Sequence, residues 1–283
     1  MHNYKPDFTK FIHATNVTGS KKAASYIRAL DLLSQMLATN PQGMSDCKNI
    51  WTVNSVNRLH ELYLVVLDES RKKDRSVWNI DGLPKSYLQN GYCSAAIKAF
   101  QSFLVEFSYE QSLLTTLSSE DFDESTRVED LNLNFQFPEY LVDDIENMSG
   151  ENVIRAVKAR VNQNVFRKKI LEIYRETCCI TGLNIPEINR ASHIIPWADD
   201  EKKRLDPRNG LCLSATYDAA FDRNLISLDE DYRIIVSKDI KDHYCNESVK
   251  EYFAKKEGDA ITLPSSFLPH KDYLSDHRNK GSF

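Results

Sequence analysis

The chain has 283 residues, of which 41% are hydrophobic and 27% are charged. This balance is typical of a folded globular protein and excludes the disordered and fibrous classes. The apolar run at residues 62–67 is far shorter than the roughly 20 residues that cross a bilayer, and the first residues lack the apolar stretch of a signal peptide. We therefore expect a cytoplasmic protein with no membrane partner.

The net charge of −5 would argue against a nucleic-acid partner if the acidic residues were spread evenly. They are not, because residues 101–150 carry 12 acidic side chains and one basic side chain. Residues 1–100 carry 13 basic and 8 acidic side chains, and residues 151–283 carry 22 and 21. The two blocks that flank the acidic segment are therefore neutral to mildly basic, which leaves room for a polyanionic partner.

The six cysteines predict reduced thiols rather than disulfides, since a chain of this length without a secretory signal is expected in a reducing compartment. Cys178 and Cys179 are adjacent and the other four are scattered. No Cys-x-x-Cys pair is present, so a structural zinc site is not expected.

Three amphipathic helices are predicted in the first part of the chain. In the first, apolar residues recur every three or four positions after Ser20 and stop at Asn40-Pro41; the others span about residues 56–68 and 94–117. Their apolar faces are typical of a buried core. We expect a helical N-terminal domain over residues 1–117, with a DNA-binding or regulatory role.

Basic and aromatic side chains are interleaved between the second and third of these helices. Such a mixture can follow a phosphate backbone and stack on bases, so the loop is a candidate DNA contact. The alternative, which we favour, is a solvated helix end whose aromatic side chains belong to the core. The residues concerned are Arg71, Lys72, Lys73, Arg75, Trp78, Lys85 and Tyr87.

An acidic segment follows, over residues 118–150, with ten Asp or Glu side chains and a single Arg. A run of like charges repels itself and favours an extended linker or a solvated face. We expect it to separate two domains. Apolar residues alternate at positions 131–137, so part of the segment is a candidate strand.

The second block, residues 151–283, begins with a predicted helix over about residues 153–176 that has a basic face and an apolar face. After it the periodicity changes to strand-like runs at residues 188–195 and 210–213, followed by a helix over residues 215–223. Two further short strands are expected at residues 225–228 and 233–236, joined by an acidic turn.

Four motifs in this block occur in an informative order, and together they resemble the HNH nucleases, in a subgroup found among restriction and phage-defence enzymes. The resemblance covers about residues 155–283 and extends upstream to residues 160–167 and downstream to residues 274–278. The four motifs are residues 179–183 (CITGL), 191–197 (ASHIIPW), 206–213 (DPRNGLCL) and 218–223 (DAAFDR).

The resemblance implies an α+β chain, in which the helical N-terminal domain precedes a C-terminal ββα-metal nuclease domain over residues 151–283. His193 matches the first His of the motif, which acts in this family as the general base. A His side chain is largely neutral near pH 7.5 and can accept a proton from water. Asn209 matches the middle Asn, whose amide in the family ties the loop between the strands and orients the base; the alternative is a simple turn at Asn209-Gly210.

Asp218 departs from the family pattern, because it stands where the last His of the motif is usual. A carboxylate is a competent ligand for Mg²⁺, so the predicted site is an H-N-D site with one Mg²⁺ or Mn²⁺ ion. Asp222 lies four residues further on and shares the helix face of Asp218, which makes it a second metal-ligand candidate. At even odds, Asp222 instead caps the helix or pairs with Arg223 or Arg190.

Six basic residues are candidate phosphate contacts in this block, and each could equally be a surface charge that is paired with a nearby acid. They are Arg160, Arg167, Lys168, Lys169, Arg190 and Arg208.

The function predicted from these residues is metal-dependent hydrolysis of DNA, double-stranded in the first instance, in restriction or anti-phage defence. RNA is an alternative substrate, and a homodimer or a partner subunit of a defence system is an open alternative to a monomer. The competing function is that of a catalytically inactive DNA-binding or regulatory subunit with the same fold.

Overall fold

The computed structural model describes residues 1–16, 20–117 and 150–283. They fall into two compact units: the first holds residues 1–109 and 150–154, and the second holds residues 110–117 and 155–283. Apart from Gly150, the predicted acidic linker lies outside the described residues.

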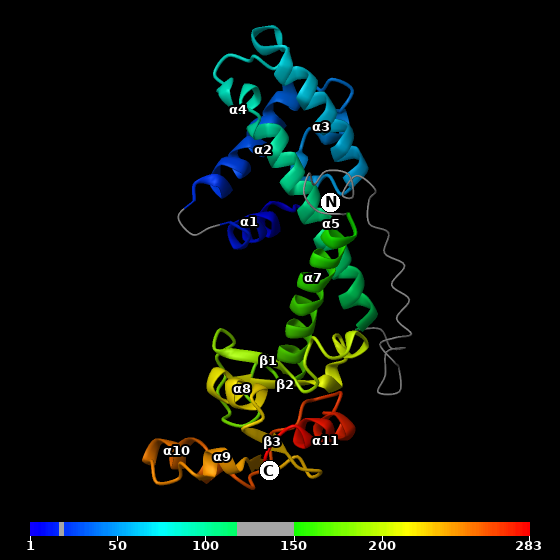
Figure 1. Cartoon of the computed structure of the whole chain (residues 1–283). Helices are drawn as coiled ribbons and strands as arrows, with labels where there is room; N and C mark the ends of the chain where they lie inside the picture. Colours follow the sequence, from blue (N-terminus) through cyan, green and yellow to red (C-terminus); the bar gives the residue numbers. More distant parts are fainter. Residues whose placement is uncertain (17–19, 118–149) are drawn as a thin grey trace. The chain divides into compact units, whose positions relative to one another are not determined.

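The first unit is helical, as predicted (Figure 1). The helices predicted after Ser20, at residues 56–68 and at residues 94–117 are confirmed. Two further helices were not predicted: Lys5–Ala14, whose apolar positions are few, and Ser86–Gln89, which is only four residues long. The elements are α1 (Lys5–Ala14), α2 (Lys22–Thr39), α3 (Val56–Arg71), α4 (Ser86–Gln89) and α5 (Tyr92–Leu117), whose last turns belong to the second unit.

Aromatic rings from distant parts of the sequence form the core of this first unit. The ring of Phe8 on α1 meets the ring of Phe100 on α5 edge to face, with centroids 5.4 Å apart. Trp51 packs against both of them, at 5.7 Å and 5.6 Å. Such edge-on pairs add to the stability that burial of the rings provides.

The basic loop after α3 is anchored by a buried acid. The Glu69 side chain accepts hydrogen bonds from the Ser76 hydroxyl at 2.7 Å and the Val77 amide at 3.0 Å, and it pairs with Lys72 at 2.7 Å. Trp78 is buried, and its indole nitrogen donates to the Asn40 carbonyl at 2.7 Å. Trp78 is therefore a core residue, as the favoured interpretation of this loop predicts.

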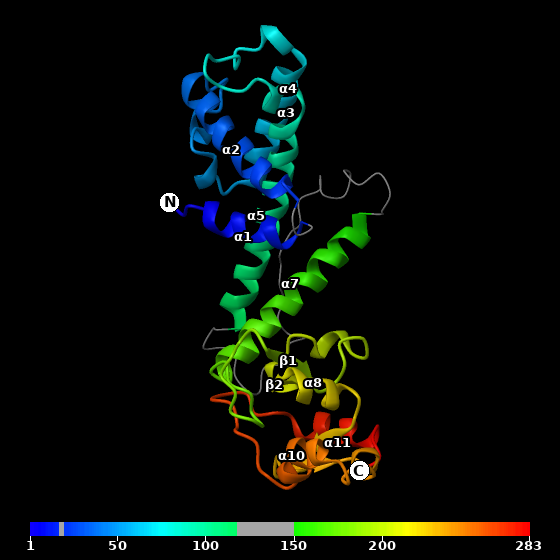
Figure 2. The same cartoon turned by 90° about the vertical axis from the view of Figure 1, so that its left-hand side faces the viewer.

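The second unit combines a long helix with two small sheets (Figure 2). Helix α7 (Gly150–Ile173) is followed by the antiparallel pair β1 (Asn189–His193) and β2 (Gly210–Ser214), and helix α8 (Ala215–Asp222) packs on both strands. His193 lies opposite Gly210 in this pairing. The helix and the two strands predicted from the motif residues are confirmed.

The remainder of the second unit is a second hairpin and three helices. Its strands, β3 (Ile226–Leu228) and β4 (Ile234–Val236), pair antiparallel as predicted. The helices, which were not predicted, are α9 (Lys238–Lys241), α10 (Glu247–Tyr252) and α11 (Lys271–Asn279).

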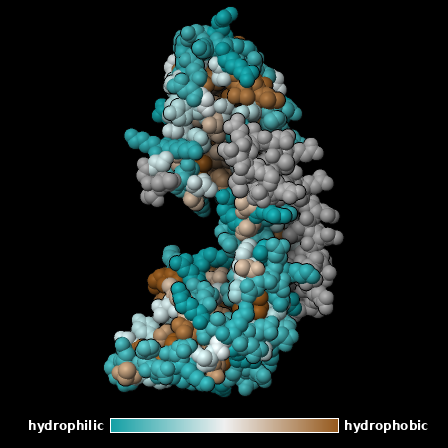
Figure 3. Space-filling view, viewed as in Figure 1, coloured by the Kyte–Doolittle hydropathy of each residue, from teal (hydrophilic) through white to brown (hydrophobic). Residues whose placement is uncertain are grey.

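Across the described residues, no helix combines the length and the apolar character that a membrane crossing requires. Hydrophilic residues cover most of the visible surface of each unit (Figure 3). The cysteines are free thiols, and all but Cys245 are buried. The structure thus agrees with the prediction of reduced cysteines.

Candidate active site

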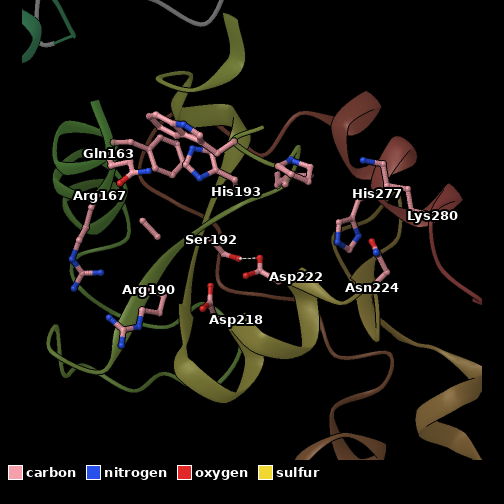
Figure 4. Close-up of a pocket in the computed structure, with 15 residues that line it drawn as sticks. Gln163, Arg167, Arg190, Ser192, His193, Asp218, Asp222, Asn224, His277 and Lys280 are labelled. Atoms are coloured by element: carbon pink, nitrogen blue, oxygen red, sulfur yellow. Dashed lines mark hydrogen bonds between the residues drawn. The ribbon is translucent and has the colours of Figure 1, made fainter. Parts of the chain in front are cut away.

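Two of the three predicted catalytic residues, His193 and Asp218, line one cleft in the second unit, with a volume of about 610 Å³ (Figure 4). Its walls come from α7, β1, the segment that follows β1, α8 and α11. His193, Asp218 and Asp222 all line it. Residues far apart in the sequence therefore converge where the motifs predict a site.

His193 is held in one orientation by contacts on several sides. Its ring stacks on the ring of Phe166, with centroids 3.7 Å apart and planes at 13°, and meets the edge of Trp197 at 5.5 Å. Its Nε2 lies 3.1 Å from the carbonyl oxygen of Arg204. Because a carbonyl only accepts, Nε2 carries the proton and Nδ1 keeps its lone pair. Burial lowers the pKa of His193, which favours this neutral form.

The stacking on His193 depends on a glycine. Gly210 lies opposite His193 in the strand pair, and helix α7 passes directly over it. A Cβ at this position would lie 2.3 Å from Ile170 Cδ1 and 2.7 Å from Phe166 Cζ. Only glycine allows so close an approach, so Gly210 indirectly sets the position of the Phe166 ring.

Gly210→Ala is expected to lower the free energy of unfolding by about 1–3 kcal/mol, because Ile170 and Phe166 are both buried and have little space to move. The same change should reduce activity further than the loss of stability explains, since it displaces the ring that orients His193. Thermal unfolding and cleavage rates measured on folded protein check both effects. Gly182→Ala, at a positive φ with open space around the added Cβ, is the control that leaves this packing intact.

Asn209 closes the loop between the two strands, as the resemblance implies. Its side-chain oxygen accepts from the Ile195 amide at 2.7 Å, and its side-chain nitrogen donates to the carbonyls of Ile195 at 3.2 Å and Lys203 at 3.1 Å. Asn209 itself is buried. It therefore joins the segment after His193 to the start of β2 without lining the cleft.

Asp218 and Asp222 lie one helical turn apart on α8 and face the same space as Ser192 (Figure 4). The Ser192 hydroxyl donates to Asp222 at 3.4 Å. Burial raises the pKa of Asp218, and the neighbouring Asp222 carboxylate raises it further, while Ser192 and Arg190 partly offset these effects. Partial desolvation likewise raises the pKa of Asp222. Two carboxylates that repel each other in this way favour a bound cation.

The donor set suits a hard cation. Within the described residues, no three His, Cys, Asp or Glu side chains gather as a metal-ligand cluster. An ion held by Asp218 and Asp222 would therefore take its other ligands from water or substrate. That fits Mg²⁺, which keeps several waters and is bound by one or two carboxylates, better than it fits zinc.

Of the six predicted phosphate contacts, Arg167 and Arg190 line the cleft. The Arg167 guanidinium already donates to the carbonyls of Asn189 at 2.8 Å and Pro186 at 2.7 Å. Arg190 is exposed, and its side chain forms no hydrogen bond or ion pair with any other described residue.

The other four predicted contacts lie outside the cleft. Lys168 pairs with Glu110, and Arg160 is exposed on α7. Lys169 is buried beside Glu172, at 3.4 Å. Arg208 binds the buried Asp206 through two nitrogens, each at 2.9 Å. These pairings favour structural roles for Lys169 and Arg208.

Helix α11 contributes His277 to the cleft, and Lys280 follows its last turn, although neither was predicted as a site residue. The Nε2 of His277 lies 3.0 Å from the Phe221 carbonyl and its Nδ1 lies 2.9 Å from the Ser227 hydroxyl. Both ring nitrogens are thus occupied, and the imidazole is a buried neutral tie between α11, α8 and β3. Burial lowers its pKa to about 4.

Acidification is expected to destabilise the second unit through His277. Its pKa is about 4 in the folded state, against about 6.5 in an unfolded chain, so the unfolded state binds more protons between these values. The free energy of unfolding should fall by up to about 3 kcal/mol as the pH drops from 6.5 to 4. Urea unfolding at several pH values measures this slope. His277→Gln should be less stable at pH 7 but should lose much of the slope; an unchanged slope would contradict this role.

The sequence analysis also missed Phe166 and Trp197 as contacts of His193. Both lie within segments that carry the family resemblance, but aromatic residues there are equally typical of a core. Only their stacking on His193 distinguishes the two interpretations.

Residues 178–229 match the family model of HNH endonucleases. The matched segment contains β1, β2 and α8, and hence His193, Asn209, Asp218 and Asp222. No curated protein matches the chain.

Proposed function

We propose that this chain is a metal-dependent endonuclease that hydrolyses phosphodiester bonds in DNA, because residues 178–229 match the family model of HNH endonucleases. The observation that carries the proposal is the cleft itself. A neutral imidazole with a free lone pair and two carboxylates with raised pKa values line the same space.

His193 is the proposed general base. Its Nδ1 accepts a proton from the water that attacks phosphorus, while Nε2 remains bonded to the Arg204 carbonyl, which stabilises the imidazolium that forms. Phe166 and the loop closed by Asn209 hold the ring in place. Because these contacts exist before substrate binds, little free energy is needed to reorganise the site during the reaction.

Asp218 and Asp222 are the proposed ligands of one Mg²⁺ or Mn²⁺ ion. When bound, such an ion neutralises the negative charge that develops on the phosphate oxygens and on the leaving oxygen. Ser192 donates to Asp222 and keeps that carboxylate turned toward the cleft.

The direct test is incubation of supercoiled plasmid with the purified protein and Mg²⁺ or Mn²⁺, with EDTA as the metal-free control. Phage DNA, chemically modified DNA and RNA are run alongside, because the cleft does not distinguish these substrates. We expect metal-dependent nicking or cutting of at least one DNA. Intact DNA in every combination of metal and substrate would refute the proposal.

The alternative is an inactive HNH-fold subunit that binds DNA or regulates a larger system. It is favoured by the carboxylate at position 218, where the family usually has His, and by the small number of metal ligands. Calorimetric titration with Mn²⁺ separates the two, because a protein with a functional site should bind the ion and an inactive one should not.

The proposed biological role is restriction or anti-phage defence, and it rests on the subgroup that the motifs resemble. A gated effector of such a system would be silent in isolation and active with its partner. Cutting both strands of a duplex would ordinarily require two sites, so the oligomeric state in solution is the first measurement for this part of the proposal.

A further inference from the structure

A positive side chain lies toward each end of the cleft, and two negative side chains lie between them. Arg190 and Lys280 stand toward opposite ends, with Asp218 and Asp222 between them (Figure 4). The cation at one end comes from β1, and the cation at the other follows the last turn of α11. Each strand of a DNA duplex carries one negative charge per about 3.4 Å of helix axis, so a strand that crosses this cleft has a phosphate on either side of the attacked one.

The two central carboxylates repel every phosphate of a strand that lies across the cleft. A bound cation would relieve their repulsion of the phosphate under attack, but not of the phosphates on either side of it. Those neighbours require positive charge of their own at each end of the carboxylate pair. Arg190 and Lys280 are placed to supply it.

Arg190 is available for this contact without rearrangement. It is exposed, lines the cleft and has no partner among the described residues. A guanidinium in this setting can bind a phosphate through two nitrogens.

Lys280 is paired with an acid from the segment that follows β1. Its ammonium pairs with Asp199, in the segment after β1, at 2.7 Å, and the two side chains are 44% and 46% exposed. A pair this exposed contributes little stability, so a phosphate can replace the carboxylate at small cost. Asp199 therefore competes with substrate for Lys280.

From this layout we infer that the cleft recognises a phosphodiester inside a strand, with Arg190 binding the phosphate on one side of the attacked bond and Lys280 the phosphate on the other. The inference rests on the proposed function and adds the two residues that hold the strand on either side of the attacked bond. A terminal phosphodiester would leave one of the two cations unused.

The test pairs each cation with one phosphate. A DNA bond that the wild-type protein cuts is first mapped on a plasmid fragment. Oligonucleotides containing that bond are then made with one neutral methylphosphonate, on either the 5′ or the 3′ neighbouring phosphate. We expect each replacement to lower kcat/KM of the wild type by about ten-fold, the size typical of a lost charged hydrogen bond.

The variants then assign the contacts. Arg190→Gln should lose its sensitivity to one replacement and Lys280→Gln its sensitivity to the other. Lys280→Gln should raise KM. Asp199→Asn should instead lower KM by up to about five-fold, because it frees the lysine to bind phosphate. Lys250→Gln is the matched control, since Lys250 is 45% exposed and pairs with Glu247 at 2.6 Å outside the cleft. This variant should keep the wild-type kcat/KM and the wild-type sensitivity to both methylphosphonates.

Unchanged thermal unfolding of the variants shows that each remains folded. A wild-type enzyme that cuts DNA but is indifferent to both methylphosphonates would overturn the inference and leave the proposed function standing. Variants that keep both sensitivities would overturn it too. A protein that cuts no DNA refutes the proposed function, and the inference falls with it.

Discussion

His193→Ala is expected to lower the rate of metal-dependent DNA cleavage by about 10²- to 10⁴-fold, the usual range for loss of a general base. The Nδ1 lone pair of His193 faces no hydrogen-bond partner among the described residues and is the proton acceptor of the proposed reaction. Rates of plasmid nicking at saturating Mg²⁺ measure the effect. His243→Ala, which removes an exposed imidazole outside the cleft, is the matched control and should cut at the wild-type rate.

The pH profile gives a second check on the same residue. Burial lowers the pKa of His193 below its ordinary value of 6.5. At constant temperature and metal concentration, the wild-type cleavage rate should therefore fall only when the pH drops below 6.5. His193→Ala should lack this acid limb. Equal nicking by the variant and the wild type would contradict the role of His193 as base.

Asp218→Ala is expected to weaken Mn²⁺ binding by at least about ten-fold and to lower cleavage by about 100-fold or more, because it removes one of two proposed ligands. Asp222→Ala should have a smaller effect, since Asp222 is exposed whereas Asp218 is half-buried. Calorimetry measures the binding, and plasmid nicking measures the rate. If Asp218→Ala bound Mn²⁺ with wild-type affinity, Asp218 would not be a ligand and the ion site would lie elsewhere.

Asp218→His offers a sharper version of this test, because it restores the residue that the family usually has. A His ligand suits transition metals better than Mg²⁺. We expect the variant to be active with Mn²⁺ or Co²⁺ and to respond weakly to Mg²⁺. A variant inactive with all three ions, although folded, would show that this site requires a carboxylate.

The ββα part of the fold was predictable because its signals are local. Strand alternation around His193, the Asn209-Gly210 pair at the start of the second strand and the apolar spacing of the next helix all occur within 35 residues of sequence. The structure confirms β1, β2 and α8 and brings His193, Asp218 and Asp222 to one cleft.

The surroundings of these residues were not predictable in the same way, because they depend on tertiary pairing. Arg167 resembles a phosphate contact in the sequence. In the structure its guanidinium donates to two carbonyls, which belong to residues 19 and 22 positions away. His277 lies 56 positions from the carbonyl it binds. Local periodicity contains no information about such partners.

The segment that matches the family model is shorter than the part of the chain that builds the cleft. Phe166, which clamps the base, precedes residues 178–229, and Lys280, which borders the far end, follows them. An engineer who transplanted only residues 178–229 into another host would move the reactive groups without their walls. The smallest portable form of the proposed nuclease should instead begin within α7 and extend past α11 to include Lys280.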